Sequence, residues 1–384
     1  MIDRIKNQLN QIYESCGYRR FRMSKFESYD LYAQNRDFLK SERIITFTDL
    51  NGSLLALKPD ITLSIIKNND GTEEKVYYNE NVYRAQENTY KEIMQVGVEC
   101  IGQMDAFTAA EVVSMAARSL ASISDRYVLE LSDAGFVSLL LETMEPDETT
   151  RAVLLSCLAK KNVAGIEALS REGRLTEAHA GVLKKLMGLY LPLREGIEAA
   201  AALSPNEASD SVLAGLSRIA DILEAAELSK QIYLDFSLVN SMDYYNGIIF
   251  QGFVEGIPFS VLSGGRYDRL PEKMGKKQGA IGFAVYMDRL EAYLPHERKF
   301  DADLLLVYDK SDDYREVAAY AEGTRAVGRS VRCVRKDELS RMPKAPRCQV
   351  TILFSELSER AAGKKEKKAG AEDADGNGKE AADA

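Results

Sequence analysis

A helical, alanine-rich stretch in the middle of the chain separates two regions of strand-like sequence, and this division constrains the fold most. From residue 135 to residue 227 apolar residues recur at helical spacing, whereas runs typical of strands lie on both sides. Strands with helices segregated beside them are typical of the α+β class. The sequence therefore predicts a sheet core flanked by helices, built from residues 1–147 and 229–298, with residues 148–228 as a helical insertion.

Two pairs of strands are predicted in the first region. Residues 43–57 contain two β-rich runs on either side of Asn51-Gly52, which is the strongest short hairpin signal. Residues 73–84 and 90–101 form the second pair, with a polar loop between them. Because such short connections join antiparallel neighbours, the sheet of the core is expected to be antiparallel.

The end of the chain is predicted to hold a small separate unit and a tail. Residues 299–357 alternate strand and helix patterns, which indicates a small α/β unit near the size at which a lone core is marginal. Residues 358–384 consist mostly of Lys, Gly, Ala, Asp and Glu. Since such a segment has too few apolar residues to bury, we expect the tail to be disordered.

Composition argues against several classes of protein. The 384 residues contain no apolar run of the ~20 residues that a membrane helix needs, and the first residues lack the apolar segment of a secretory signal. Five widely spaced cysteines and only two histidines argue against a structural metal site and a histidine-based triad. The cysteines fit reduced thiols in a cytoplasmic protein. The net charge of −9 weighs against extensive contact with tRNA.

Six short motifs follow one another along the predicted core, and together they are similar to the motifs of class II aminoacyl-tRNA synthetases. The similarity is to the histidyl-tRNA synthetase branch and covers about residues 2–294. It implies a class II synthetase-like fold in which the first motif builds a dimer interface, although Ser24 replaces the family's proline there. The motifs are residues 17–29, 57–62 (LKPDIT), 81–102, 240–246, 263–268 (SGGRYD) and 282–289 (GFAVYMDR).

The resemblance implies a pocket for histidine. An ammonium and an imidazole N–H need acceptors such as carboxylates, amides and phenols. Any one such residue would be ordinary on a half-exposed sheet, but the ordered set indicates a histidine-like ligand. Asp60 is shorter by one methylene than the family's glutamate. The residues that correspond to the family's histidine-binding positions are Asp60, Thr62, Gln95, Glu99, Tyr244, Tyr245 and Tyr267.

The resemblance also predicts that the nucleotide side of the pocket is lost. Asn81 and Asn240 stand where it places synthetase arginines, and Tyr286 replaces a glycine of the ATP pocket wall. Asparagine cannot reproduce the charged, planar fork that arginine offers to a phosphate. We therefore expect no catalytic residue, no metal and no cofactor. The arginines that remain as candidates for phosphate contacts, or as ordinary surface or salt-bridged residues, are Arg84, Arg266 and Arg289.

A class II core without these cations resembles the regulatory subunits of ATP phosphoribosyltransferase, which are paralogues of histidyl-tRNA synthetases. The resemblance implies an inactive chain that supports a short-form ATP phosphoribosyltransferase catalytic subunit in histidine biosynthesis, with histidine as the effector. It further implies a homodimer within a hetero-octamer. Two alternatives stay open: an active, synthetase-like enzyme that activates an amino acid, and a paralogue that binds tRNA. The substituted arginines argue against the first, and the net charge and short C-terminal unit argue against the second.

Overall fold

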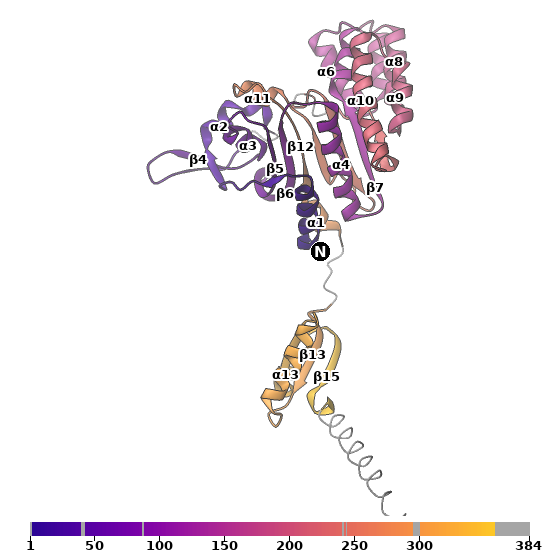
Figure 1. The fold of residues 1–384 in the computed structure, drawn as a ribbon. Helices are drawn as coiled ribbons and strands as arrows, with labels where there is room; N and C mark the ends of the chain where they lie inside the picture. The colour runs from indigo at the N-terminus through magenta and orange to yellow at the C-terminus, as the bar shows by residue number, and fades with distance from the viewer. Residues whose placement is uncertain are drawn as a thin grey trace, which may run out of the picture. The chain divides into compact units, whose positions relative to one another are not determined.

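The computed structural model describes residues 2–39, 43–86, 88–239, 242, 244–294 and 300–357. The chain divides into two compact units, Met1–Pro295 and His296–Ala384, and each is described by itself (Figure 1). The boundary predicted after residue 298 falls at residues 295–299, which lie outside the described residues. In the part of the chain that the structure describes, no helix is long and apolar enough to cross a membrane.

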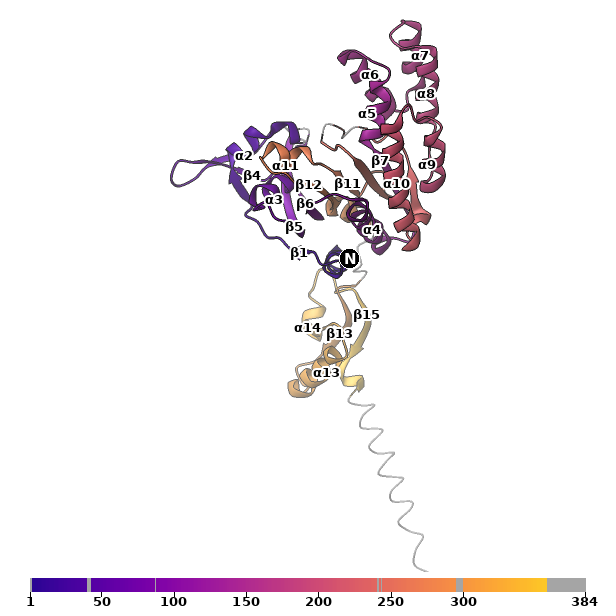
Figure 2. The ribbon, with the colours of Figure 1, turned by 45° about the horizontal axis from the view of Figure 1, so that its top comes forward.

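A nine-stranded sheet forms the centre of the first unit (Figures 1 and 2). Its neighbouring strands are antiparallel except for two parallel pairs, β1–β5 and β7–β9. A mainly antiparallel sheet flanked by helices confirms the predicted α+β class. In order across the sheet, the strands are β1 (Arg19–Arg20), β5 (Glu74–Gln86), β6 (Thr89–Gly102), β12 (Gly279–Tyr286), β11 (Leu262–Arg266), β10 (Ile248–Val254), β7 (Tyr127–Asp133), β9 (Ile232–Leu234) and β8 (Leu191–Pro192).

Helices α1 (Ile2–Ser15) and α4 (Ala106–Ile123) cover one face of this sheet (Figure 2). In α1 the buried residues Ile5, Leu9 and Tyr13 recur along a single helical face. The Tyr13 hydroxyl lies 3.2 Å from the Ser119 hydroxyl of α4, so the two helices also contact each other. The opposite face of β5, β6, β12 and β11 is left to line a cavity.

A small antiparallel sheet is built from β2 (Phe26–Ser28), β4 (Leu54–Leu57) and β3 (Thr46–Thr48). The turn between β3 and β4 places Gly52 at φ +84°, a left-handed conformation that glycine adopts without strain. This turn confirms the predicted hairpin at Asn51-Gly52. The helical segments next to this sheet are α2 (Tyr29–Gln34), the 3-10 turn Arg36–Phe38 and α3 (Thr62–Asn68).

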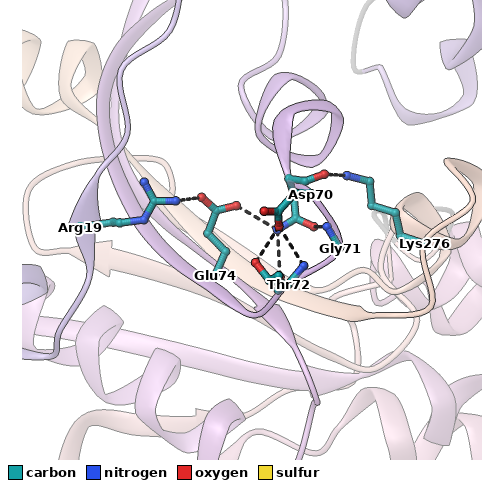
Figure 3. A network of polar contacts seen from close by, with 7 residues as sticks. Arg19, Asp70, Gly71, Thr72, Glu74 and Lys276 are labelled. Carbon is teal, nitrogen blue, oxygen red and sulfur yellow. Dashed lines mark hydrogen bonds and ion pairs between the residues drawn. The ribbon is translucent and has the colours of Figure 1, made fainter.

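A polar network fixes the end of α3 (Figure 3). The Lys276 ammonium donates to two backbone carbonyls at the end of α3, one of them that of Asn69. The Asn69 side chain donates to Glu74, which in turn pairs with Arg19 of β1. A cation at this end of a helix satisfies carbonyls that have no partner inside the helix. The network therefore anchors α3, the helix that carries Thr62.

The predicted insertion is helical except for the short strand β8, which pairs with β9 and so extends the large sheet. The Lys161 ammonium lies 2.8 Å from the Asp235 carboxylate, and the Tyr190 ring stacks on Tyr233 with 5.2 Å between centroids. These contacts join the helical region to the β9 end of the sheet. The helices after β7 are α5 (Ala134–Glu142), α6 (Glu148–Ala159), α7 (Val163–Arg171), α8 (Glu177–Met187), α9 (Leu193–Ala201) and α10 (Glu207–Ala225).

The second unit is a three-stranded parallel sheet in the order β14-β13-β15. One face of the sheet packs against α13 through Leu306, Val317, Ala321 and Phe354. The predicted tail, residues 358–384, lies outside the described residues. The elements of this unit are β13 (Ala302–Tyr308), α13 (Tyr314–Ala326), β14 (Val331–Arg335), α14 (Lys336–Leu339) and β15 (Cys348–Leu353).

Candidate functional site

Four neighbouring strands of the large sheet, β5, β6, β12 and β11, form the floor of a polar cavity. Residues opposite each other on antiparallel strands carry their side chains on the same face. The register pairs Glu99 with Gly282, and Gly282 with Gly265. A Cβ atom on Gly282 would overlap the Glu99 carboxylate, and one on Gly265 would lie 2.8 Å from the Tyr245 ring. The two glycines therefore leave the space that Glu99 and Tyr245 occupy.

Glu99 lies at the bottom of the cavity and is 3% exposed. Its Oε1 accepts a hydrogen bond of 2.8 Å from the Thr62 hydroxyl, and its Oε2 accepts one from the Tyr267 hydroxyl. Burial raises the pKa of Glu99 to about 8, and the two hydrogen bonds act in the opposite direction. Burial therefore favours the neutral acid form of Glu99, and a cationic ligand beside it would favour the ionised form.

Aromatic rings form the walls around Glu99. The centroid of the Tyr244 ring lies 4.9 Å from that of Tyr245 and 5.5 Å from that of Tyr267. Phe38, from the 3-10 turn after α2, packs edge-on against Tyr244 at 5.9 Å. Burial raises the pKa of both Tyr245 and Tyr267, so their hydroxyls stay protonated and can donate. Rings that carry hydroxyl groups suit a flat, polar ligand such as imidazole.

Further polar groups line the cavity. The Gln95 side chain is buried and lines the cavity, and no described residue hydrogen bonds to its amide. Asp60 accepts a 3.0 Å hydrogen bond from the Leu63 N–H of α3, and its Oδ2 lies 3.6 Å from the Arg84 guanidinium. Arg84 also donates from Nε to the Pro59 carbonyl at 2.7 Å. The amide and carboxylate can both accept hydrogen bonds from a ligand ammonium.

The structure brings together every residue that the sequence pointed to for binding histidine. The volume of the cavity that they share is about 50 Å³. Free histidine is larger than this, so it fits inside only if the walls move apart, and otherwise part of it lies outside the cavity. The residues that line this one cavity are Asp60, Thr62, Gln95, Glu99, Tyr244, Tyr245 and Tyr267.

The predicted substitution at Asn81 lies away from the cavity. Side chains alternate along a strand, so Asn81 points away from the face of β5 that carries Tyr78 and Arg84. There the Asn81 amide donates to Glu92. Arg84 lines the cavity and supplies a positive charge there, whereas residue 81 does not line the cavity. Asn240, the second predicted substitution, lies outside the described residues.

The other two candidate arginines do not line the cavity. Arg266 lies on the face of the sheet opposite Tyr267, where its Nε donates a 2.7 Å hydrogen bond to Asp268. Arg289, in α12 (Met287–Tyr293), stacks on the Tyr286 ring with 4.4 Å between the guanidinium carbon and the ring centroid. Tyr286 itself lines the cavity. Arg289 therefore contacts the site through the Tyr286 ring.

Two residues of the site were not singled out from the sequence. Tyr78 lies opposite Gly97 on the cavity face of the β5–β6 hairpin. Alternation along the predicted strand could have found it, because Tyr78 and Arg84 are separated by an even number of residues. Phe38 comes from a separate turn, and no periodicity links it to the sheet.

Comparisons with known proteins agree with this arrangement. The family model for histidyl-tRNA synthetase matches residues 1–290. The chain belongs to the histidyl-tRNA synthetase family. A curated ATP phosphoribosyltransferase regulatory subunit from Clostridium kluyveri is 30% identical over 340 residues, which cover 84% of this chain and 86% of that protein. A regulatory subunit from Bacillus thuringiensis is 28% identical and covers 80% of this chain and 77% of its own length.

A solved structure extends the comparison to three dimensions. It is described as an ATP phosphoribosyltransferase regulatory subunit/histidyl-tRNA synthetase from Bacillus halodurans. Its TM-score to this chain is 0.74 at 25% sequence identity, with 92% of this chain and 94% of that chain covered. The predicted class II synthetase-like fold and the predicted resemblance to the regulatory subunits are both confirmed.

Proposed function

We propose that this chain is a non-catalytic regulatory subunit of ATP phosphoribosyltransferase in histidine biosynthesis. It associates with the short-form catalytic subunit, supports its activity and transmits inhibition by histidine. The names of the relatives from Clostridium kluyveri and Bacillus thuringiensis support the regulatory role and the class of partner. The cavity around Glu99 supports histidine as the effector.

The observation that carries the effector proposal is the buried carboxyl of Glu99, held between Thr62 and Tyr267. An imidazole N–H donates to a carboxylate, and the bond is strongest when the carboxylate is ionised. Because both Glu99 oxygens already have a hydrogen-bonding partner, their orientation is fixed before a ligand arrives. Gln95 and Asp60 supply acceptors for the ligand ammonium.

The charges of the cavity argue against activation of an amino acid. Activation brings a carboxylate against the α-phosphate of ATP, and fixed cations stabilise the negative charge that develops. Within the described ranges, Arg84 is the only cationic side chain that lines the cavity, and Asp60 lies 3.6 Å from its guanidinium. The Tyr286 ring separates Arg289 from the cavity, and about 50 Å³ leaves no room for a nucleotide.

The small cavity also supports an allosteric mechanism. An effector shifts an equilibrium only if it binds one arrangement of the complex better than another. Histidine would select an arrangement in which Tyr244 and Tyr245 lie farther from Glu99. Since Phe38 packs against Tyr244, that movement would pass to the turn Arg36–Phe38 and to the neighbouring α2.

We place the homodimer contact of the proposed hetero-octamer at the first motif. That motif contains β2, where Phe26 is 45% exposed. The Phe26 ring packs edge-on against Phe47 of β3, which is 38% exposed, with 5.5 Å between centroids. Two adjacent exposed aromatic rings support a protein contact surface. A dimeric mass by light scattering that falls to the monomeric mass in Phe26→Ser would agree with this placement, and a monomeric wild type would contradict it.

The function is tested by copurification and by two assays. The native partner that copurifies with the full-length chain should have ATP phosphoribosyltransferase activity, which rises when the chain is added and falls with histidine. The purified chain alone should show no histidine-dependent exchange between ATP and pyrophosphate. Robust exchange would support the alternative, an active synthetase-like enzyme, and would overturn the proposal.

A further inference from the structure

The sheet of the second unit has two edges of different character. Strand β13 lies between β14 and β15, so each outer strand has one side without a strand partner among residues 300–357. Such an edge can add a strand from another chain, and proteins commonly block their edges with charged side chains. The two edges of this sheet can therefore be compared by the charged side chains that each carries.

The β14 edge is blocked by arginines. The strand itself carries Arg332 and Arg335 within five residues. The Arg325 side chain, from the end of α13, donates a 3.2 Å hydrogen bond to the Val331 carbonyl. Addition of a further strand here would bury these charges or displace them, which costs free energy.

The β15 edge carries none of these features. Its six residues, CQVTIL, include no charged residue and no proline. Val350, near the middle of the strand, is 50% exposed. Within residues 300–357, no side chain hydrogen bonds to the backbone of these six residues. This combination is typical of an edge that pairs with another strand.

A groove with apolar and charged residues in its lining runs beside the open edge. Its volume is about 800 Å³. Its lining includes Val350 and Ile352 of β15 and Val327 from the α13 side, together with the charged residues Asp303 and Arg329. Val327 is 74% exposed. Exposed apolar side chains in a groove next to an unblocked edge indicate a surface that another chain covers.

We infer that β15 is a self-association surface, on which a second copy of this chain adds its own β15 in antiparallel orientation. A two-fold axis perpendicular to the sheet joins three strands from each copy and keeps Val350 and Ile352 of both copies on the same face. The side chains of each copy then cover the groove of the other. This surface is separate from the contact proposed at β2.

Charges at the two ends of β15 favour this occupant and this orientation. Exposed Arg347 precedes the strand, and exposed Glu356 follows it. In the antiparallel orientation, the start of β15 in one copy lies near the end of β15 in the other copy. Arg347 of one copy then lies on the same side as Glu356 of the other. Parallel pairing would set like charges beside each other, which is unfavourable. The strand is therefore complementary to itself in the antiparallel orientation.

Hydrogen exchange of the full-length chain, read by mass spectrometry, tests this inference without interference from other contacts between copies. Pairing protects outward-facing N–H groups of β15 in proportion to the fraction of paired chains. If about nine-tenths of the chains are paired at high concentration, exchange of these groups slows about tenfold relative to dilute protein. Peptides that cover β14 should exchange at the same rate at both concentrations.

Matched lysine substitutions on the two edges separate specific pairing from general association. Val350→Lys should abolish the concentration-dependent protection, and Thr351→Lys, at an exposed position, repeats the test should the first variant fold poorly. Cys333→Lys, at an exposed position of β14, should leave the protection unchanged. Protection that is absent, independent of concentration, lost equally in Cys333→Lys, or seen only with the catalytic subunit would overturn the inference.

Discussion

Replacing Glu99 by glutamine separates the shape of the site from its charge, because the two side chains are nearly isosteric and only glutamate ionises. A hydrogen bond to a charged group contributes about 1.5–3 kcal/mol. At pH 7, the cost of ionising an acid whose pKa is raised to about 8 offsets part of this contribution. Near pH 8.5 that cost almost disappears. Glu99→Gln should therefore weaken histidine binding by at most about tenfold at pH 7 and by about ten- to a hundredfold near pH 8.5.

Titration calorimetry at the two pH values measures both effects. The wild type should bind histidine roughly eightfold more tightly at the higher pH, whereas Glu99→Gln should show no such gain. Glu130→Gln is a matched control, because burial also raises the pKa of Glu130 but this residue does not line the cavity. The same pH dependence in wild type and Glu99→Gln would refute the reasoning. Unchanged binding in both Glu99→Gln and Tyr245→Phe would show that the cavity is not the histidine site.

Three further outcomes are expected. Because the pKa of Glu99 is higher in the folded chain than the ordinary value of 4.5, stability falls as pH rises from 4.5 toward 8. Glu99→Gln should remove that slope in urea titrations at a series of pH values, and an unchanged slope would contradict this. Gly282→Ala should displace the Glu99 carboxylate and abolish histidine binding by calorimetry, whereas Gly181→Ala, where a Cβ meets open space, should not. Truncation after residue 357 should leave the melting temperature unchanged, since the tail has few apolar residues to bury, and a large fall would show that it packs.

The sequence was sufficient for two hairpins of the first unit. Alternation and turn chemistry predict the β3–β4 and β5–β6 hairpins, and the structure contains both. The same alternation, applied to β5, would have placed Asn81 and Arg84 on opposite faces. The position of a residue within a motif does not carry this information. The cation was therefore expected to be missing at a position that does not face the cavity.

Contacts between distant segments could not be predicted in this way. Phe38 reaches the site because the turn Arg36–Phe38 packs against Tyr244, more than two hundred residues later in the chain. The stacking of Arg289 on Tyr286 depends on how α12 leaves β12. Neither contact leaves a periodic signal, because each depends on tertiary packing rather than on the local pattern.

The pairing of β8 with β9 limits how this chain can be recombined with its relatives. A helical insertion joined only through flexible loops could be exchanged as a module, but here its strand supplies the outermost hydrogen bonds of the large sheet. A chimaera that removes residues 148–228 would expose the edge of β9 and leave Asp235 without Lys161. An exchange that keeps residues 161 and 190–192 with the core retains the strand, the ion pair and the Tyr190 ring. A segment that can be exchanged without loss of these contacts is therefore shorter than residues 148–228.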